Sequence, residues 1–417
     1  MMKGVSNRVR AEAHLVAGPR PRHIGRTALL VVLALVLTMG SAIGIGYHSL
    51  QSNISQTDVN DLLGGDETAP PIDQNEGRAL NILVLGSDSR DGMESNVEGM
   101  RADTTMLFHV SADRSRVDVT SIPRDLLVDI PACTVRTGED LDETFETSPA
   151  SNQMFNSAFS YGGQTGDVPS GAACAMKTVE SMTDIKLDGY VVVNFKSFQE
   201  IVDAIGGVPM YFEETVDDPK ANLKVSAGCR LLDGKQALGL ARARKTLGDG
   251  SDISRIGRQQ ELVTAMMNEV LSMNLLTNMP SLYKVLDAAT ANLDTSKGLG
   301  DIPTLGGLAN SLRNIEMKNI QFVTTPFAYA GNRVTPTEDA DVLWDALAND
   351  KPFKSSEDEY GNISIELIKD SETQKPTESA TTPAATPTEE PSSEATTEPS
   401  DDQSTGAPVC TKENAQG

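Results

Sequence analysis

Short apolar runs alternate with amphipathic stretches along the middle of the chain. Residues 80–86 (LNILVLG) form a continuous apolar run that ends in glycine, which is typical of a strand buried on both faces. Segments rich in β-branched and aromatic residues predict four further strands, at 104–110, 117–123, 189–195 and 320–326. Strands that alternate with helices predict an α/β protein built around a mostly parallel or mixed sheet.

Three segments between these strands repeat apolar residues with the period of a helix. The first, 195–207, has apolar residues at i, i+3, i+4 and i+7, and Gly206 is expected to cap its C-terminus. The second, 233–244, begins with Asp233 and Gln236 at the spacing of a capping box. The third carries an apolar stripe formed by Leu262, Val263, Met266, Met267, Val270 and Leu271.

A longer apolar run near the N-terminus predicts a membrane segment. Residues 27–47 contain no charged side chain and, at about twenty residues, can span a bilayer as a helix. Basic residues dominate 1–26, where Glu12 is the only acidic residue, and acidic residues follow the run as far as Arg78. The positive-inside rule predicts a single-pass protein of the cell membrane, with a cytoplasmic N-terminus and an extracellular domain. A cleaved signal peptide is the alternative, because Gly40–Ala42 resembles a cleavage site.

Composition divides the rest of the chain into three parts. We expect a linker at 48–78, a catalytic domain at 79–352 and a mostly disordered tail at 353–417. Within the tail, 372–408 holds eight acidic residues and one lysine, and no aromatic residue follows Tyr360. Such a segment cannot bury enough apolar surface to offset the entropy lost on ordering.

All four cysteines follow the apolar run, in what would be an oxidising space. Cys133, Cys174, Cys229 and Cys410 allow three pairings, and their spacings match neither a zinc site nor a CxxC redox motif. We expect structural disulfides. Cys133 with Cys174 is the preferred pair, because it closes an insert-like segment rich in Thr, Glu and Ser.

The net charge of the chain limits which classes of molecule it can bind. The chain has a net charge of −24, with 35 Lys and Arg against 59 Asp and Glu, which argues against a broad nucleic-acid surface. Basic residues nevertheless gather around the loop 247–252, and they are Arg242, Arg244, Lys245, Arg255 and Arg258. Exposed charges beyond about 8–10 Å are screened, so this local cluster can bind a small anion in an acidic protein. The helix expected after the loop adds an N-terminus that favours an anion.

Charged side chains also mark the ends of three predicted strands, as the pairs Asp88 and Arg90, Arg101 and Asp103, and Arg124 and Asp125. Ligands of such sheets bind beyond the carboxyl ends of the strands. Arginine binds phosphate oxygens in bidentate fashion, and carboxylates hold Mg²⁺ together with waters and phosphates. A single such pair is more often a surface salt bridge worth under about 1 kcal/mol. Their repetition, with the arginine cluster, indicates a phosphate site. No GxGxxG or P-loop follows the first strand, which argues against a nucleotide.

Seven motifs occur in an order that resembles the LytR–CpsA–Psr family. They are NILVLGSDSR, RADTTML, SIPRD, FNSAFSYGG, VVVNFKSFQEIVDAIGGV, LDGKQALGLARAR and DISRIGRQQ, and they cover about residues 80 to 272. The resemblance implies a three-layer α/β/α sandwich with a central mixed sheet, anchored by one N-terminal transmembrane helix. It implies transfer of a glycopolymer from a polyprenyl-pyrophosphate carrier to peptidoglycan through a phosphodiester, with Mg²⁺ or Mn²⁺. The segment 131–153 looks like an insertion relative to shorter family members.

The resemblance also assigns roles to individual residues. Asp88 and Asp103 match the acidic residues associated with the metal, and either is a candidate general base. The residues that match the catalytic and pyrophosphate-binding set are Arg90, Arg101, Arg124, Arg242, Arg244, Arg255, Arg258 and Gln259. The lipid chain of such proteins lies between sheet and helices, where the candidates are Phe195, Phe198, Ile201, Val202, Leu262 and Met266, although such a stripe is more often plain core.

Other functions stay open on the sequence. A pyrophosphatase acting on the lipid carrier, a transferase to a surface-protein acceptor, and a non-catalytic regulator that binds lipid-linked sugar would all need the same anion site. Residue patterns identify neither the glycopolymer nor the acceptor.

Overall fold

The computed structural model describes residues 24–64, 77–87, 100–138, 140–244, 246–248, 250–273, 279–290, 293–312, 315–359, 361–368, 410–411 and 414–415. The chain divides into two compact units, Met1–Ser49 and Leu50–Gly417. Most of helix α1 (Ile24–Asn53) belongs to the first unit. In the part of the chain that the structure describes, no helix combines the length and the apolar character needed to cross a membrane. The transmembrane helix at 27–47 stays a prediction from the sequence.

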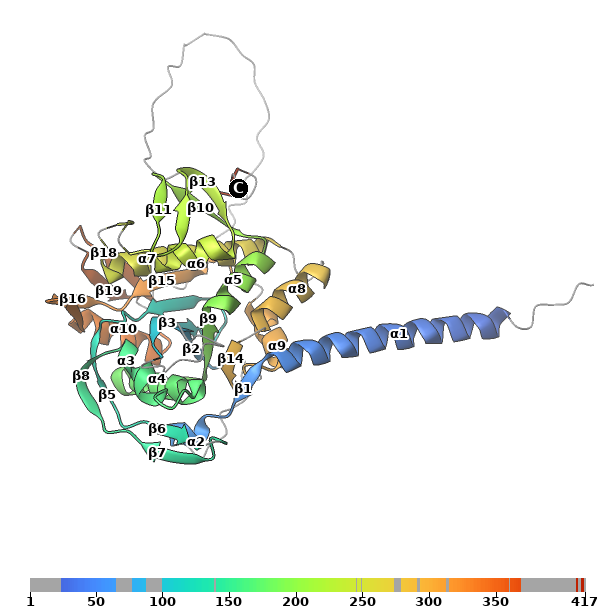
Figure 1. Cartoon of the computed structure of the whole chain (residues 1–417), viewed down its shortest axis with the longest axis horizontal. Helices are drawn as coiled ribbons and strands as arrows, with labels where there is room; N and C mark the ends of the chain where they lie inside the picture. The colour runs from blue at the N-terminus through green and yellow to red at the C-terminus, as the bar shows by residue number, and fades with distance from the viewer. Residues whose placement is uncertain are drawn as a thin grey trace, which may run out of the picture. The chain divides into compact units, whose positions relative to one another are not determined.

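A seven-stranded mixed sheet forms the centre of the second unit (Figure 1). In spatial order its strands are β1 (Ser55–Thr57), β14 (Leu293–Ser296), β9 (Gly189–Asn194), β2 (Leu80–Ser87), β3 (Ala102–Val110), β4 (Val117–Ser121) and β15 (Ile320–Thr324). Strand β2 runs parallel to β9 and antiparallel to β3, and β4 runs antiparallel to β3 and parallel to β15. All five strands predicted from apolar runs are present, and the mixed sheet is confirmed.

Helices cover both faces of this sheet, as the apolar run of β2 predicts. Leu83 and Leu85 belong to a core shared with α3 (Asn156–Gly162), α4 (Val168–Thr183) and α10 (Glu338–Ala348). Leu80 and Ile82, at the alternate positions, face a second core that includes residues of α7 (Asp252–Ser272) and α9 (Ile302–Leu312). Successive strand residues point to opposite faces, so one strand supplies both layers of core. In Figure 1, α3 and α4 lie on one side of the central strands and α6 and α7 on the other.

A third core lies among the helices beyond the sheet. It joins α5 (Phe195–Ala204), α6 (Gly234–Arg242) and α7 to the hairpin β10 (Val208–Phe212) and β13 (Gly228–Leu232). The predicted capping box is present at the start of α6, where Asp233 accepts from the backbone N–H of Gln236 and the Gln236 side chain accepts from the N–H of Asp233. Helix α5 ends at Ala204, and Gly206 follows it with a positive φ of 84°.

Five further strand pairs and three helices complete the described elements. They are α2 (Asn60–Leu63), β5 (Leu127–Ile130) with β8 (Ala150–Met154), β6 (Thr134–Thr137) with β7 (Glu143–Glu146), β11 (Val216–Asp218) with β12 (Leu223–Val225), α8 (Met279–Thr290), η1 (Met317–Asn319), β16 (Phe327–Ala330) with β17 (Arg333–Pro336), and β18 (Phe353–Glu357) with β19 (Ile363–Leu367). The hairpin β18–β19 lies within the segment predicted to be mostly disordered. Its residues Phe353 and Ile365 are buried in the core beside α10. The acidic composition that predicts disorder belongs to 372–408, which lies outside the described residues.

Two disulfides tie distant segments together. The preferred pair Cys133–Cys174 is confirmed and joins the insert-like segment to α4. Cys229 of β13 is bonded to Cys410 across a sequence separation of 181 residues. The second bond holds a described residue from near the C-terminus against the β10–β13 hairpin.

Helix α7 contains an exposed glycine that no packing contact explains. A Cβ placed on Gly257 would meet no heavy atom within 4 Å, and this residue does not have a positive φ. A glycine inside a helix costs about 1 kcal/mol relative to alanine. The chain therefore tolerates a local loss of helix stability at a position where a side chain would fit.

Two acidic side chains, Asp294 of β14 and Asp167, interact beside the central sheet. The Tyr190 hydroxyl donates to Asp294 Oδ1 over 2.9 Å, and Asp167 is close enough to repel the Asp294 carboxylate. Burial, reinforced by Asp167, raises the pKa of Asp294 from 3.8 to about 6. A carboxyl group with a raised folded-state pKa binds its proton more tightly in the folded state than in the unfolded chain.

Replacing Asp294 by Asn is expected to flatten the dependence of stability on pH. The stabilisation that protonated Asp294 contributes is fully present below pH 3.8, the unfolded pKa, and is lost as pH rises through about 6. At one pKa unit per about 1.4 kcal/mol, the wild type should lose at most about 3 kcal/mol relative to D294N over this range. Chemical unfolding between pH 4 and 7 measures it. The exposed Asp217, changed to Asn, is the control, and parallel pH curves for wild type and D294N would contradict the assignment.

Candidate functional site

Three elements bring charged side chains to one edge of the central sheet. Asp103 lies near the start of β3, and Arg124 follows the end of β4. Because β3 and β4 are antiparallel, these two positions meet at the same edge. The first turn of α7 adds Asp252 and Arg255, with Ser251 as its N-cap. Residues more than a hundred and forty positions apart in sequence thus converge.

The four side chains form one network of ion pairs. Arg124 Nη1 donates to Asp103 Oδ1 over 3.0 Å, and Arg124 Nε lies 3.0 Å from Asp252 Oδ1. Arg255 Nη2 lies 2.6 Å from the same Asp252 oxygen and donates to the backbone oxygen of Asp103 over 2.9 Å. Asp252 therefore binds both arginines. The sequence prediction that Arg124, Arg255 and Asp103 meet is consistent with this geometry.

One end of the network is buried in the protein and the other end is exposed to solvent. Arg255 is 4% exposed and Asp252 is 8% exposed, whereas the Asp103 side chain is 41% exposed. Burial raises the pKa of Asp252, although the guanidinium groups of Arg255 and Arg124 offset part of the effect. Burial also opposes ionisation of Asp103, but Arg124 and Arg255 outweigh it and lower the Asp103 pKa. Asp103 is thus an ionised carboxylate at the open end of the network.

The protein stabilises the charge of Arg124 more than it stabilises the charge of Arg255. Burial disfavours its charge, but the carboxylates of Asp252 and Asp103 outweigh that penalty and raise its pKa. Burial lowers the pKa of Arg255, with Asp252 opposing the shift. Among the described residues, both oxygens of Asp252 and the Nε of each arginine lack a partner in hydrogen-bond geometry. Buried polar groups left in this state are costly and are concentrated at functional sites.

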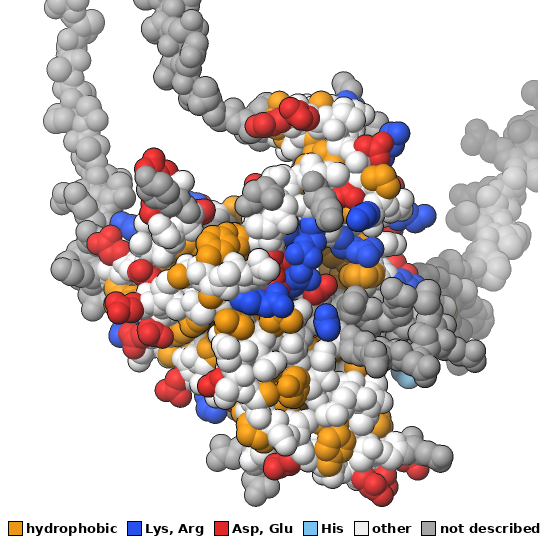
Figure 2. Space-filling view, turned by 60° about the vertical axis from the view of Figure 1, so that its left-hand side comes forward, with side chains coloured by type: hydrophobic (Ala, Val, Ile, Leu, Met, Phe, Trp, Pro, Cys, Tyr) orange, Lys and Arg blue, Asp and Glu red, His pale blue; other side chains and the backbone are white. Residues whose placement is uncertain are grey.

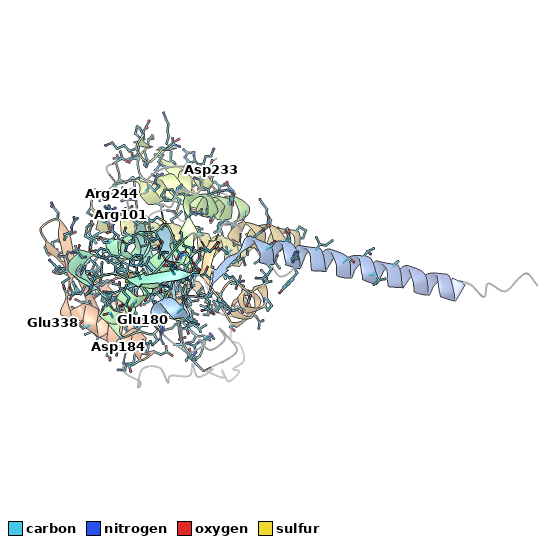
Figure 3. All side chains as sticks on the ribbon, turned by 60° about the horizontal axis from the view of Figure 1, so that its bottom comes forward. Arg101, Glu180, Asp184, Asp233, Arg244 and Glu338 are labelled. Carbon is cyan, nitrogen blue, oxygen red and sulfur yellow. A yellow bond between two sulfur atoms is a disulfide. The ribbon has the colours of Figure 1, made fainter. Side chains whose placement is uncertain are left out.

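Further arginines border the network. Arg244 is half-buried and interacts electrostatically with Asp252 and Arg255. Arg242 is exposed, and its guanidinium carbon lies 4.6 Å from the centre of the Phe195 ring, which is a cation–π contact. Arg101 is exposed directly before β3, and Figure 3 labels it near Arg244 in that view. Figure 2 shows basic side chains gathered in one area of the domain surface, with acidic and hydrophobic side chains beside them.

The side chains of Arg258 and Gln259 donate hydrogen bonds mainly to backbone oxygens and do not belong to the ion-pair network. Arg258 donates to the backbone oxygens of Ala243 and Leu247 over 2.6 and 3.2 Å and to Ser254 Oγ over 2.7 Å. Gln259 is buried and donates to the oxygen of Ala241 over 3.0 Å. These contacts fix the end of α6 and the segment that carries Arg244. Direct contact of these two side chains with a pyrophosphate stays a prediction.

Two predicted site residues cannot be placed. Asp88 and Arg90 lie outside the described residues. Within the described part of the chain, no group of three His, Cys, Asp or Glu side chains could hold a metal ion. Asp103 still fits a metal that takes one or two carboxylates, because it is ionised, exposed and engaged by Arg124 through Oδ1. That Asp103 binds a metal stays a prediction.

The predicted lipid-binding residues lie mainly in a packed core. Val202 and Leu262 are buried in the third core, and Phe198 and Met266 pack against it. Phe195 and Ile201 are half-buried. Val202 and Leu262 are therefore core residues, and lipid contact by the four half-buried residues stays a prediction. Val84, Phe108 and Val191, on the sheet face toward α7 and α9, are also half-buried.

Sequence reasoning missed Asp252, which connects the two arginines. The sequence pattern places it at the end of the loop 247–252. The signal was present in the spacing, since Asp252 and Arg255 lie at i and i+3 and so share one face of the helix. Its raised pKa and its burial required the tertiary structure.

Comparisons with known proteins agree with this architecture. The LytR_cpsA_psr family model matches residues 46–349. The cell wall biosynthesis protein LcpA of Corynebacterium glutamicum is 28% identical over 318 residues, which cover 72% of this chain and 59% of LcpA. The polyisoprenyl-teichoic acid–peptidoglycan teichoic acid transferase TagU of Oceanobacillus iheyensis is 30% identical over 58% of this chain and 68% of TagU. The crystal structure of protein gbs0355 from Streptococcus agalactiae matches with a TM-score of 0.50 and 20% identity, over 65% of this chain and 87% of that one, which supports the fold.

Proposed function

Because the chain belongs to the LytR–CpsA–Psr family, we propose that it is a phosphotransferase that moves a glycopolymer from a polyprenyl-pyrophosphate carrier to peptidoglycan. The names of relatives such as TagU support both the lipid-linked donor and the peptidoglycan acceptor. The observation that carries the proposal is the network of Arg124, Arg255, Asp252 and Asp103, with Arg244 beside it. Its guanidinium groups are the donors that bind phosphate oxygens in bidentate fashion.

The proposed reaction is displacement at phosphorus. The oxygen of an acceptor hydroxyl forms a bond to the phosphorus next to the sugar, and the bond from that phosphorus to the bridging oxygen breaks. Polyprenyl phosphate leaves with the electron pair, and the hydroxyl proton passes to a base. Such transfers depend on positioning and on neutralising charge on the phosphate oxygens, which Arg124, Arg244 and Arg255 can supply.

Asp103 is better suited to hold a cation than to act as the base. Its lowered pKa makes it a weak proton acceptor at neutral pH. We propose that Asp103, together with Asp88, holds Mg²⁺ or Mn²⁺. Such a metal would neutralise charge on the diphosphate oxygens. The protein residues orient the diphosphate whether or not the metal contributes.

We also propose that the donor reaches the site from a membrane. The support is the uncharged run 27–47, preceded by the basic segment 1–26, which predicts an anchor with the domain outside the cell. The half-buried residues Val84, Phe108 and Val191 offer an apolar surface to the lipid chain close to the sheet. They join the half-buried residues of the α5 and α7 stripe as candidate lipid contacts.

A reconstituted assay tests the function. The detergent-solubilised full chain is incubated with Mg²⁺, a lipid-diphosphate-linked oligosaccharide and peptidoglycan fragments. The products are identified by mass spectrometry. A phosphodiester-linked adduct formed only with peptidoglycan is expected. Release of free saccharide phosphate without acceptor would instead indicate a pyrophosphatase, and binding without turnover would indicate a regulator. A protein acceptor that outcompetes peptidoglycan would also overturn the proposal.

A further inference from the structure

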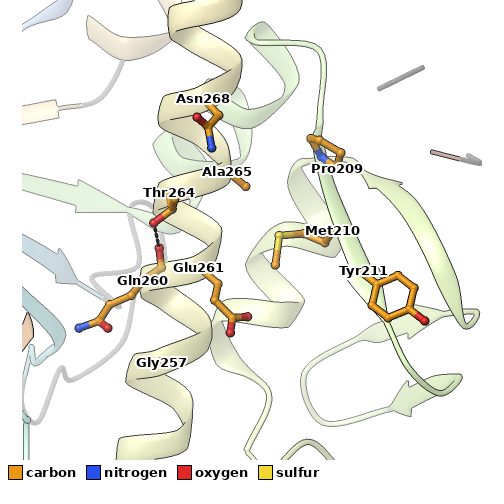
Figure 4. A pocket seen from close by; sticks show the side chains of 9 residues that line it. All are labelled: Pro209, Met210, Tyr211, Gly257, Gln260, Glu261, Thr264, Ala265 and Asn268. Atoms are coloured by element: carbon orange, nitrogen blue, oxygen red, sulfur yellow. Dashed lines mark hydrogen bonds between the residues drawn. The ribbon is translucent and has the colours of Figure 1, made fainter. Parts of the chain in front are cut away.

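A groove runs along the face of α7 that is turned away from the arginine network. A cavity of about 440 Å³ lies between α7 and β10, with α7 residues Gly257, Glu261, Thr264 and Asn268 on one side and Met210 and Tyr211 on the other. Figure 4 shows Met210 extending from β10 toward α7, while the ring of Tyr211 points away from α7 at the outer rim. From Gly257 to Asn268 the helix rises about 16 Å. We call this cavity, with the one described next, the α7 groove.

The groove continues toward the diphosphate site. A second cavity of about 330 Å³ shares Met210, Tyr211 and Glu261 with the first and is bounded by Thr246, Leu247 and Gly248. Leu247 belongs to the segment that Arg258 holds and lies three positions after Arg244 in sequence. A ligand in the groove therefore has one end beside the loop that carries Arg244. Both volumes are in the range of cavities that bind small molecules or segments of a chain.

The groove has a glycine, Gly257, on its α7 side, so the helix backbone is uncovered there. Gly257 is exposed in the interior of α7, and a Cβ there would meet no heavy atom within 4 Å. No contact within the described structure requires a glycine, and the helix loses stability by having one. Close approach of a ligand to the backbone is a physical reason for a glycine at such a place.

Charge in the groove is opposite in sign to that of the arginine network. The side chains of Glu213, Glu214 and Glu261 line the groove, and no described group of three such residues could hold a metal ion. The one basic side chain in the lining, Arg258, is already bonded to backbone oxygens. An anionic ligand is repelled here, which excludes a phosphate-rich polymer and the acidic segment 372–408 as occupants.

The polar groups fit uncharged sugar rings. Carboxylates accept from hydroxyl groups, and the Asn268 amide can both donate to and accept from hydroxyl and acetamido groups. The Gln260 amide instead donates to Ser121 Oγ and Thr324 Oγ1 of the sheet over 2.9 and 3.2 Å. The Thr264 hydroxyl donates to the backbone oxygen of Gln260 over 2.7 Å (Figure 4). Tyr211 is 38% exposed and presents a flat aromatic surface at the rim.

We propose that the α7 groove binds an uncharged stretch of the acceptor glycan strand next to the reacting sugar. The reacting sugar itself lies beyond the end of the groove, past Thr246, Leu247 and Gly248, where its hydroxyl can approach the diphosphate. This inference rests on the proposed transferase function. The anionic donor lies on the face of α7 with Asp252 and Arg255, and the neutral stretch of the acceptor lies on the face with Gly257 and Glu261.

Gly257→Trp tests the assignment, because the new side chain projects into open groove and not into packed protein. The matched control is Gly306→Trp in α9, where a Cβ also meets nothing within 4 Å. Each full-length variant is assayed in detergent for transfer and, without donor, for binding of an uncharged strand, a β-1,4-linked N-acetylglucosamine oligomer. We expect G257W to raise the KM for acceptor and to weaken strand binding at least tenfold, with donor affinity within twofold of wild type. G306W should match the wild type.

Two further results keep the test decisive. Gly257→Ala should unfold at a higher temperature than wild type with an unchanged acceptor KM, which shows that the position tolerates substitution. Equal strand binding by wild type and G257W would overturn the inference, and so would a loss of donor affinity as large as the loss of acceptor affinity. If the wild type transfers nothing but binds strands that G257W does not, strand binding in the α7 groove is supported and the transferase function is contradicted. If transfer occurs and G257W is unaffected, the transferase function is supported and strand binding in the α7 groove is contradicted.

Discussion

Replacing Arg124 by alanine is expected to lower the rate of glycopolymer transfer about a thousandfold. Arg124 lies between the carboxylates of Asp103 and Asp252, and its raised pKa keeps it charged where the diphosphate is proposed to bind. Loss of one preorganised donor to a developing charge costs about 10²- to 10³-fold, and arginines that act in phosphoryl transfer can be worth more. The measurement is the rate of adduct formation at saturating donor and acceptor.

R124A should also be less stable than the wild type. Removing one partner from a buried ion cluster leaves the others uncompensated, so we expect a loss of about 3 kcal/mol in the free energy of unfolding. Arg124→Lys, which keeps the charge but not the bidentate fork, separates the two effects by restoring stability more than rate. Arg333→Ala is the matched control, because Arg333 pairs with Asp125 at 3.4 Å and is well exposed. Wild-type transfer by folded R124A would remove Arg124 from the site.

Asp252→Asn is expected to reduce transfer about a hundredfold without lowering stability at neutral pH. The variant keeps the size of the side chain but not the charge that holds Arg124 Nε at 3.0 Å and Arg255 Nη2 at 2.6 Å. We assign Asp252 as a positioning residue that acts through these arginines. The two guanidinium groups would then reorient, and a hundredfold loss corresponds to about 2.7 kcal/mol of transition-state stabilisation.

The stability of D252N follows from the direction of the Asp252 pKa. Burial raises that pKa above the unfolded value, so the stabilisation from protonated Asp252 is fully present below the unfolded pKa and is lost as pH rises through the folded pKa. Asparagine resembles the protonated acid at every pH, so D252N should be at least as stable as the wild type at pH 7 and should converge with it in acid. Burial outweighs the attraction of the two guanidinium groups at Asp252, whereas the carboxylates outweigh burial at Arg124, so only the loss of Arg124 removes net stabilisation. A variant that is both inactive and much less stable at pH 7 would contradict it.

The central sheet was predictable because burial on two faces leaves a plain signal in sequence. The run 80–86 and the four other apolar segments all became strands, with boundaries that differ by a few residues. The edge strand β1 (SQT) and its neighbour β14 (LDTS) have no such signal. Their strand conformation comes from backbone pairing, β1 with β14 and β14 with β9, which only the assembled sheet provides. Tertiary context of this kind overrides local propensity.

The site was predictable where sequence position and strand end coincide. Asp103 and Arg124 sit at adjoining ends of antiparallel neighbours, so the prediction that they meet needs little more than the order of strands. The roles of Arg258 and Gln259 were harder to anticipate, because the loop after α6 places free backbone oxygens beside them. An arginine near a phosphate site binds whichever acceptor lies nearer. Spacing along a helix does not reveal that choice.

The bond between Cys229 and Cys410 has a consequence for handling the protein. A protease that cuts once between Leu367 and Cys410 produces two polypeptides that are still covalently joined. On a denaturing gel the nicked molecule keeps its full mass until a reductant is added, and only then does the short C-terminal fragment separate. Limited proteolysis of this chain therefore has to be compared with and without reducing agent.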